Sequence, residues 1–183
     1  MNWTIPGTTL TDRRDNADNV EAIFHSMFLA GGMVLSQVSA ITGLEAYTIQ
    51  NWVKRGFLAA PKNKRYDLEQ VSRIITINML KGALPLEKIC SLMQYINGDL
   101  IDESDDIIDD AVLYFMFVKL AARARHIGGN QSWEEAIDNA MSTYAEPIPG
   151  ARERVEKVLR AMLMAYISSR FKAQVDAMVD ELQ

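Results

Sequence analysis

The sequence of 183 residues contains few of the residues that build disulfide-linked folds, metal centres or membrane spans. Cys90 is its single cysteine, so no disulfide can form within the chain, and this fits a reducing compartment. His25 and His126 lie far apart and neither has a neighbouring ligand residue, which argues against a zinc cluster. No apolar run approaches the roughly 18 residues of a membrane span. The first residues show no basic stretch followed by an apolar core. We therefore expect a cytoplasmic protein with no signal peptide and no membrane span.

Motifs for catalysis and cofactor binding are also missing. No Ser-His-Asp order, glycine-rich phosphate loop or nucleophile elbow stands out, so we expect neither an enzyme nor a cofactor. Segment 102–110 is acidic but lacks the Asp-x-Asp-x-Asp-Gly pattern of a calcium loop. We favour carboxylates that face solvent at a helix N-terminus, where the helix dipole stabilises them, over a metal site. A third interpretation is that this segment docks near a basic loop and masks it. The carboxylates are Asp102, Glu103, Asp105, Asp106, Asp109 and Asp110.

Strand patterns are almost absent, and apolar residues recur at the three- and four-residue spacing of helices. The fold class predicted from this periodicity is all-α. A minimal two-stranded wing at 58–66 and a loose arm at 1–15 are the exceptions. The predicted helices cover residues 17–30, 36–42, 46–55, 68–81, 85–96, about 110–126, 132–144 and 151–182. We divide the chain into an N-terminal arm and helix (1–32), a central domain (33–98) and a C-terminal helical domain (99–183).

The net charge of −5 conceals an uneven distribution. Residues 45–88 carry eight cations and four anions, whereas residues 99–150 carry three cations and eleven anions. A locally basic surface on an acidic protein indicates that this surface meets a polyanion and the rest does not.

Two short helical patterns, at 36–42 and 46–55, are hinged at Gly43, and a run of cations follows the second. A helix-turn-helix of this kind places its second helix in the major groove of DNA. Ile49, Trp52 and Val53 form the apolar stripe of the second helix, which leaves its other face for polar contacts. The candidate DNA-binding residues are Tyr47, Thr48, Gln50, Asn51, Lys54, Arg55, Lys62, Asn63, Lys64, Arg65 and Tyr66.

The candidate residues differ in the role that their chemistry favours. Gln50 and Asn51 can pair with adenine edges, and the cations can reach guanine or phosphate. We expect Trp52 to anchor the core rather than stack on a base, and Tyr66 to pin the wing rather than contact a ligand. Two roles stay open for Tyr47, which either caps the helix or touches phosphate.

The order of these motifs resembles the winged helix-turn-helix of the mercury-resistance-regulator (MerR) type. The matching residues are Gly43-Leu44, Thr48-Ile49, Trp52, Gly56-Phe57-Leu58, Pro61, Arg65-Tyr66 and Leu86-Glu87-Lys88-Ile89. The sequence differs from the MerR type after Ile49, has a shorter wing, and continues into about 85 residues of helical pattern instead of one long coiled coil. The whole chain is also similar to a bacterial family called domain of unknown function 1836. That resemblance implies a regulator-like N-terminal half and no known effector.

These observations favour a DNA-binding transcriptional regulator that acts as a homodimer on double-stranded DNA. The alternative is a protein-interaction adaptor, in which the helix-turn-helix binds a protein partner instead. The C-terminal half is rich in methionine and aromatic residues, which favours a core or an oligomer interface over a pocket for a small-molecule effector.

Overall fold

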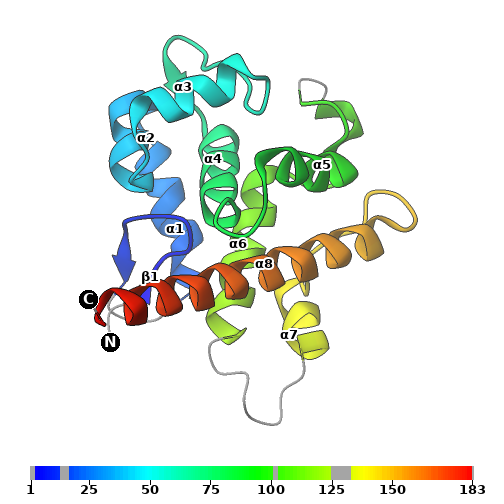
Figure 1. Cartoon of the computed structure of the whole chain (residues 1–183). Coiled ribbons are helices and arrows are strands. Elements are labelled where there is room, and N and C mark those ends of the chain that lie inside the picture. The colour runs from blue at the N-terminus through cyan, green and yellow to red at the C-terminus, as the bar shows by residue number, and fades with distance from the viewer. Residues whose placement is uncertain (1–2, 13–16, 101–102, 125–132, 183) are drawn as a thin grey trace.

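The computed structural model describes residues 3–12, 17–100, 103–124 and 133–182. Most of these residues are helical, which confirms the all-α prediction (Figure 1). None of the described helices is both long enough and apolar enough to cross a membrane. The helices are α1 (Ala17–Phe28), α2 (Leu35–Thr42), α3 (Ala46–Lys54), α4 (Leu68–Leu80), α5 (Leu86–Asn97), α6 (Asp110–Ala124), α7 (Trp133–Ala140) and α8 (Ala151–Asp180), with a 3-10 turn η1 (Glu103–Asp105).

Helix α4 forms the centre of the molecule. Every residue from Val71 to Leu80 except Asn78 is buried, because α1, α2, α5, α6 and α8 all pack against this helix. Its start is fixed by a capping box in which the Asp67 side chain accepts from the Gln70 N–H and the Gln70 side chain accepts from the Asp67 N–H. Figure 1 shows α4 and α6 at the centre, with α8 passing below α4 and across α6, and α3 at the far end from α8.

The expectation of a loose N-terminal arm is wrong. Trp3 and Ile5 are each only 2% exposed and belong to the core. Strand β1 (Trp3–Thr4) pairs antiparallel with β2 (Thr11–Asp12), and the Tyr114 hydroxyl donates to the Pro6 carbonyl at 3.0 Å. Sequence periodicity missed this segment because two-residue strands carry too few positions to show alternation.

The wing also differs from the prediction. Strand β4 (Arg65–Tyr66) pairs with β3 (Met33–Val34), the segment just before α2, and not with another part of 58–66 apart from the single bridge between Lys62 and Arg65. The Arg65 N–H donates to the Lys62 carbonyl at 2.9 Å across a tight turn. Asn63 and Lys64 occupy this turn with φ of 51° and 60°, values typical of a type I′ hairpin turn.

Helix boundaries agree with the sequence at α3, α4 and α5 to within one residue. Helix α2 begins at Leu35, one residue before its predicted start at 36, and the Gln37 side chain accepts from the Val34 N–H at 2.9 Å. Helix α7 ends at Ala140 rather than near Tyr144. Ser132, His126 and Asp102 lie outside the described residues. One continuous core joins residues of all three predicted domains, and the domain boundaries stay a prediction.

We predict that Trp3→Ala lowers the free energy of unfolding by about 3–5 kcal/mol, the usual cost of removing a large aromatic from a core. Thr4→Ala is the matched control, because Thr4 is the exposed neighbour in the same strand, and we expect a change within about 0.5 kcal/mol. Urea denaturation followed by circular dichroism measures both. Equal stability of the two variants would contradict a packed N-terminal segment.

Candidate nucleic-acid interface

The α2–α3 helix pair is joined by a turn of three residues, Gly43 to Glu45. Gly43 takes a left-handed conformation with φ of 68°, and its N–H donates to the Ser39 carbonyl at 2.8 Å. Left-handed backbone of this kind favours glycine, so the residue identity produces the turn. Leu44 is buried directly after it, and this fixes the entry into α3.

Helix α3 is amphipathic. Ile49 is fully buried and Trp52 is 3% exposed, so Trp52 is a core residue. The helix ends in a Schellman motif, in which the Phe57 N–H donates to the Trp52 carbonyl and the Gly56 N–H donates to the Val53 carbonyl. Gly56 has φ of 75°, the left-handed conformation that this motif requires and that glycine adopts readily.

The opposite side of α3, which we call the polar face, is exposed to solvent. It consists of Tyr47, Gln50, Asn51 and Lys54, with Thr48 half-buried at its edge. Tyr47 is 71% exposed, a high value for an aromatic side chain. The wing turn (Lys62–Arg65) and the polar face both lie beside α2, since α3 and β4 each contact that helix. The residues of the polar face and the turn are therefore parts of one end of the molecule.

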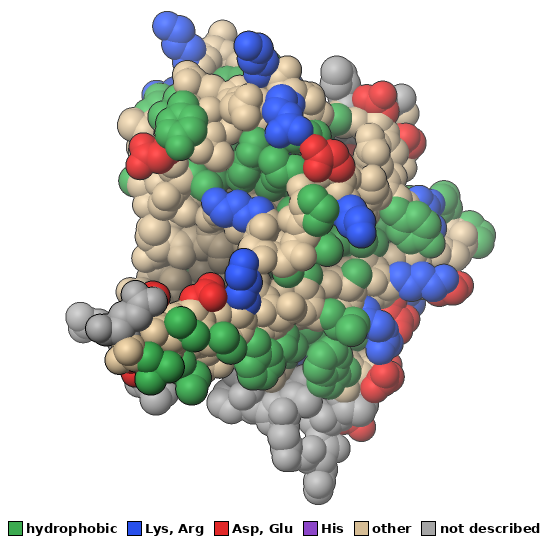
Figure 2. Space-filling model, viewed as in Figure 1, with side chains coloured by type: hydrophobic (Ala, Val, Ile, Leu, Met, Phe, Trp, Pro, Cys, Tyr) green, Lys and Arg blue, Asp and Glu red, His purple; other side chains and the backbone are tan. Residues whose placement is uncertain are grey.

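The cations at this end fall into two groups. Arg55 pairs with Glu87 at 2.8 Å and lies over the Phe57 ring, and Arg65 donates to the Gly32 carbonyl at 2.6 Å. These two arginines are engaged in contacts within the protein. In contrast, none of the acidic side chains that the structure describes forms an ion pair with Lys54, Lys62 or Lys64. Figure 2 shows Lys and Arg side chains gathered at the end that carries α3.

The remaining two candidate DNA-binding residues, Tyr66 and Asn63, differ in their exposure to solvent. Tyr66 is 3% exposed and its ring packs in the core below the wing turn, so we leave it out of the proposed contact surface. Asn63 is exposed at the tip of the turn. The structure thus brings together the polar face of α3, Lys62, Asn63 and Lys64 on one accessible surface.

Beneath the wing lies a feature that sequence reasoning missed, a cavity of about 420 Å³ that we call the acidic pocket. Residues of the loop 58–62, the start of α4, the end of α5, the segment between α5 and α6, and the first residue of α6 line it. Its carboxylates are Asp67, Glu69, Asp99, Asp106, Asp109 and Asp110, and its cations are Lys62 and Arg73. The acidic segment is evident in the sequence. No local sequence pattern predicts that Glu69, Arg73 and Asn97 of other helices lie beside it.

Burial, and after it the crowding of negative charge, raises the pKa values of three carboxyl groups in this pocket. Burial, together with the charges of Asp109, Asp110 and Asp67, raises the pKa of Glu69 to about 7, although the N–H of Ala111 donates to Glu69 at 2.8 Å and opposes the shift. Burial and the charge of Asp110 raise the pKa of Asp106 to about 6. Burial also raises the pKa of Asp110, even though Arg73 pairs with it at 3.0 Å.

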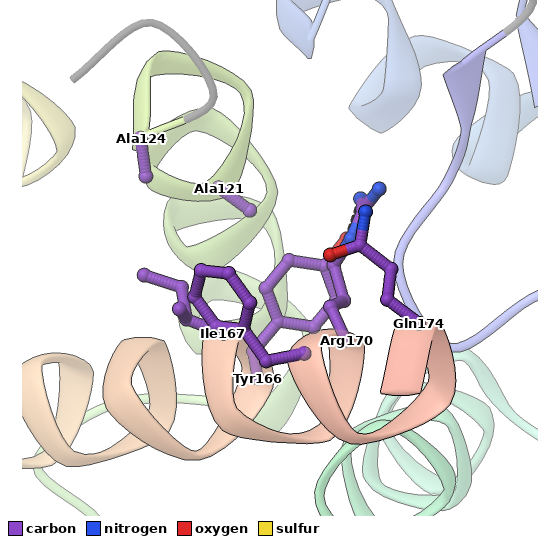
Figure 3. A pocket seen from close by; sticks show the side chains of 7 residues that line it. Ala121, Ala124, Tyr166, Ile167, Arg170 and Gln174 are labelled. Carbon is purple, nitrogen blue, oxygen red and sulfur yellow. Dashed lines mark hydrogen bonds between the residues drawn. The ribbon is translucent and has the colours of Figure 1, made fainter. Parts of the chain in front are cut away.

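A second cavity, of about 280 Å³, lies between α6 and α8. Figure 3 shows Tyr166 and Ile167 of α8 facing Ala121 and Ala124 of α6 across it, with Arg170 and Gln174 at one side and Phe171 completing the lining. Tyr166 and Phe171 are the aromatic residues of this lining. Most of the other aromatic and methionine residues in this half of the chain belong to the core, whereas Met164 is exposed; the buried ones include Tyr114, Phe115, Met116, Phe117, Met141 and Met162.

With this geometry established, comparison with known proteins gives the family. The molecule is a mostly helical protein whose α2–α3 pair is held on a central helix. A family model described as "Domain of unknown function (DUF1836)" matches residues 20–117, more than half of the chain, so the chain belongs to that family. The uncharacterized protein YkrK of Bacillus subtilis (strain 168) is 30% identical over 84 residues, which is 44% of this chain and 36% of that protein. The matched region thus spans about a third of the relative's length. No solved structure gives a significant match.

The raised pKa of Glu69 makes stability depend on pH with a definite sign. A carboxyl whose pKa is higher in the folded state stabilises the protein fully at low pH, and this contribution is lost as pH rises through about 7. We predict that the free energy of unfolding falls between pH 5 and pH 8. The raised pKa values of Asp106 and Asp110 change the stability in the same direction. Glu69→Gln keeps an acceptor for the Ala111 N–H and removes the charge, so the fall becomes smaller. Urea denaturation at a series of pH values measures the free energy of unfolding, and Asp176→Asn on α8 is the control. If the free energy of unfolding of Glu69→Gln falls as steeply with pH as that of wild type, the raised pKa of Glu69 is refuted.

Proposed function

We propose that this protein is a sequence-specific, DNA-binding transcriptional regulator that uses α3 as its recognition helix. The observation that carries the proposal is the exposed polar face of α3 beside three lysines that have no ion-pair partner among the described residues. The inner side of the same helix is fixed in the core through Ile49 and Trp52. A helix held rigidly on one side and polar on the other is suited to entry into the major groove.

The residue types on this surface suit the two kinds of contact that specific DNA binding requires. Gln50 and Asn51 carry amides that can donate to and accept from an adenine edge at the same time. Lys54, Lys62 and Lys64 would contact phosphates, which gives affinity without sequence preference and makes binding sensitive to salt. The MerR-like arrangement seen in the sequence agrees with this division, with the wing turn as the backbone clamp.

A homodimer is part of the proposal, because one short recognition helix offers too few contacts for a long operator. Support comes from the C-terminal part of α8 and the turn that follows it, where Phe171, Val175, Met178 and Leu182 repeat at four- and three-residue spacing. These side chains are 57–85% exposed, and Figure 2 shows hydrophobic side chains in a row along this helix. Apolar residues at such spacing form the seam of paired helices. The cavity beside Tyr166 supports a further proposal, a small-molecule effector site in the C-terminal helices.

A pair of variants separates affinity from sequence choice. We predict that Lys62→Ala combined with Lys64→Ala weakens binding to all DNA sequences and reduces the slope of log affinity against log salt by about 2, one for each lost phosphate contact. Gln50→Ala should cost about 1–3 kcal/mol on the preferred site and little on random DNA. The preferred site comes from selection out of a random pool, and fluorescence anisotropy over a salt series gives the affinities.

The outcomes decide between the proposed function and the adaptor alternative. Loss of equal size on selected and random DNA in the Gln50 variant would contradict base reading by α3. If the purified protein shifts no DNA fragment even at low salt, the regulator is ruled out and a protein partner for the exposed Tyr47 face becomes the better hypothesis.

For the dimer, we predict that Met178→Glu converts the protein to a monomer at micromolar concentration, because it places a charge in the apolar seam of α8. Lys172→Glu is the matched control on the same helix. Analytical ultracentrifugation distinguishes the two states, and a wild-type protein that sediments as a monomer would overturn the interface.

A further inference from the structure

Two cavities of about 280 Å³ each adjoin residues 166–170 of α8. The first, which we call the helix cavity, is the one between α6 and α8. The second, which we call the arm cavity, lies between α8 and the N-terminal segment 3–8. The side chains of Tyr166 and Arg170 line both cavities, so a ligand that contacts them is within reach of either space.

The charge at this place comes from one guanidinium group. Among the described residues that line the two cavities, Arg170 alone is charged. Its Nη1 donates to the Tyr166 hydroxyl at 3.2 Å, and its Cζ lies over the Tyr166 ring, 5.8 Å from the ring centre. No acidic side chain that the structure describes pairs with it. Arg170 is exposed, so the N–H groups that Tyr166 does not accept can be reached by a ligand.

The walls of the helix cavity suit an aromatic ring. Two small side chains of α6, Ala121 and Ala124, line one side of it, and Tyr166 and Ile167 of α8 face them (Figure 3). The Tyr166 ring meets Phe117 edge-on, with the ring centres 5.6 Å apart, and this contact fixes one wall of the cavity. A cavity of about 150 Å³ with apolar walls is large enough for benzene. The helix cavity is larger than that and therefore has room for a substituted ring.

We infer that the helix cavity binds a small aromatic carboxylate. The ring lies between the alanines of α6 and Tyr166, and the carboxylate accepts hydrogen bonds from the exposed edge of the Arg170 guanidinium. Arginine and a carboxylate match each other in this paired geometry. The Gln174 amide, which lies beside Arg170 in Figure 3, is a further donor for the same carboxylate. The described linings contain no carboxylate, which argues against a cationic ligand.

The arm cavity connects this site to the α2–α3 end of the molecule. Residues 3–8 line the arm cavity, and the chain continues directly into Thr9. The Thr9 Oγ1 donates to the Ala40 carbonyl and the Thr9 N–H donates to the Ile41 carbonyl, both at 2.8 Å, near the end of α2. A carboxylate on Arg170 lies at the edge of the segment that makes these bonds. The ligand is therefore expected to change the affinity for DNA by about 5-fold or more, an effect that rests on the proposed function.

Isothermal titration calorimetry of the full chain without DNA tests the site directly. Cinnamate is the probe, and cinnamamide, its neutral analogue of the same shape, tests whether the charge is required. We expect one equivalent of cinnamate to bind per chain, and the amide to bind about 10-fold more weakly or worse, the range for loss of a charge-assisted hydrogen bond. Arg170→Gln should weaken cinnamate binding by a similar factor and remove the preference for the acid over the amide. Lys172→Gln is the matched control on α8, because Lys172 lines neither cavity, and it should bind cinnamate as wild type does.

Three results would overturn the site: no saturable heat with cinnamate, equal affinity of wild type for the acid and the amide, or equal cinnamate binding by Arg170→Gln and Lys172→Gln. Circular dichroism of each variant confirms that it folds. If cinnamate binds to Met178→Glu and not to wild type, a second copy of the chain occupies the cavity and the inference is wrong.

The two levels of the inference fail separately. Because the calorimetry contains no DNA, a negative result there leaves DNA binding unaffected. A chain that binds cinnamate but no DNA keeps the site and rules out the regulator. In the DNA assay, cinnamate at saturation should change the affinity of wild type and leave that of Arg170→Gln unchanged. An unchanged affinity of wild type would contradict the connection through segment 3–8.

Discussion

The buried ion pair between Arg73 of α4 and Asp110 at the start of α6 holds the α2–α3 end of the molecule to the C-terminal helices. The two side chains are 8% and 12% exposed, and the Nη1 and Oδ2 atoms lie 3.0 Å apart. Arg73 also donates to the carbonyl of Phe57, just beyond the end of α3. One guanidinium thereby connects three elements that are distant in sequence. Charges this deep are tolerated only together, since removing one partner leaves an uncompensated charge at a cost of about 3–5 kcal/mol.

A second set of contacts secures the other side of the helix pair. The Asn78 amide of α4 donates to the Thr42 carbonyl at the end of α2 and to the Gly7 carbonyl of the N-terminal segment, both at 2.9 Å. Helix α2 is therefore held from α4 while the end of α3 is held through Arg73. The orientation of α3 relative to α8 is fixed within each chain, so any pairing of two copies through α8 would also set the separation of their two α3 helices. Fixed separation is what symmetric DNA half-sites require.

The parts that could be predicted from the sequence are those governed by local chemistry. Gly43 and Gly56 mark turns because left-handed backbone favours glycine, and Ile49 and Trp52 show their burial through helical spacing. The parts that could not be predicted depend on contacts between distant segments. Trp3 is buried in a core that also contains residues of α4, α6 and α8, and the acidic pocket exists because Asn97 and Glu69 meet a segment that reads as a solvated helix start. The periodicity of a single segment does not predict contacts with segments that are distant in the sequence.

Charges on this molecule act over a limited distance. Exposed charges farther apart than the screening length of about 8–10 Å hardly influence one another at physiological salt, so the net charge of −5 says little about the α3 surface. The acidic pocket is different, because Lys62 lines it and also belongs to the wing turn. None of the described carboxylates forms an ion pair with Lys62, but a polyanion that approaches Lys62 also meets the negative potential of the carboxylates that line the same pocket. The basic turn and the acidic pocket therefore act as a single electrostatic unit, and whatever changes the charge of the pocket changes the attraction of the turn.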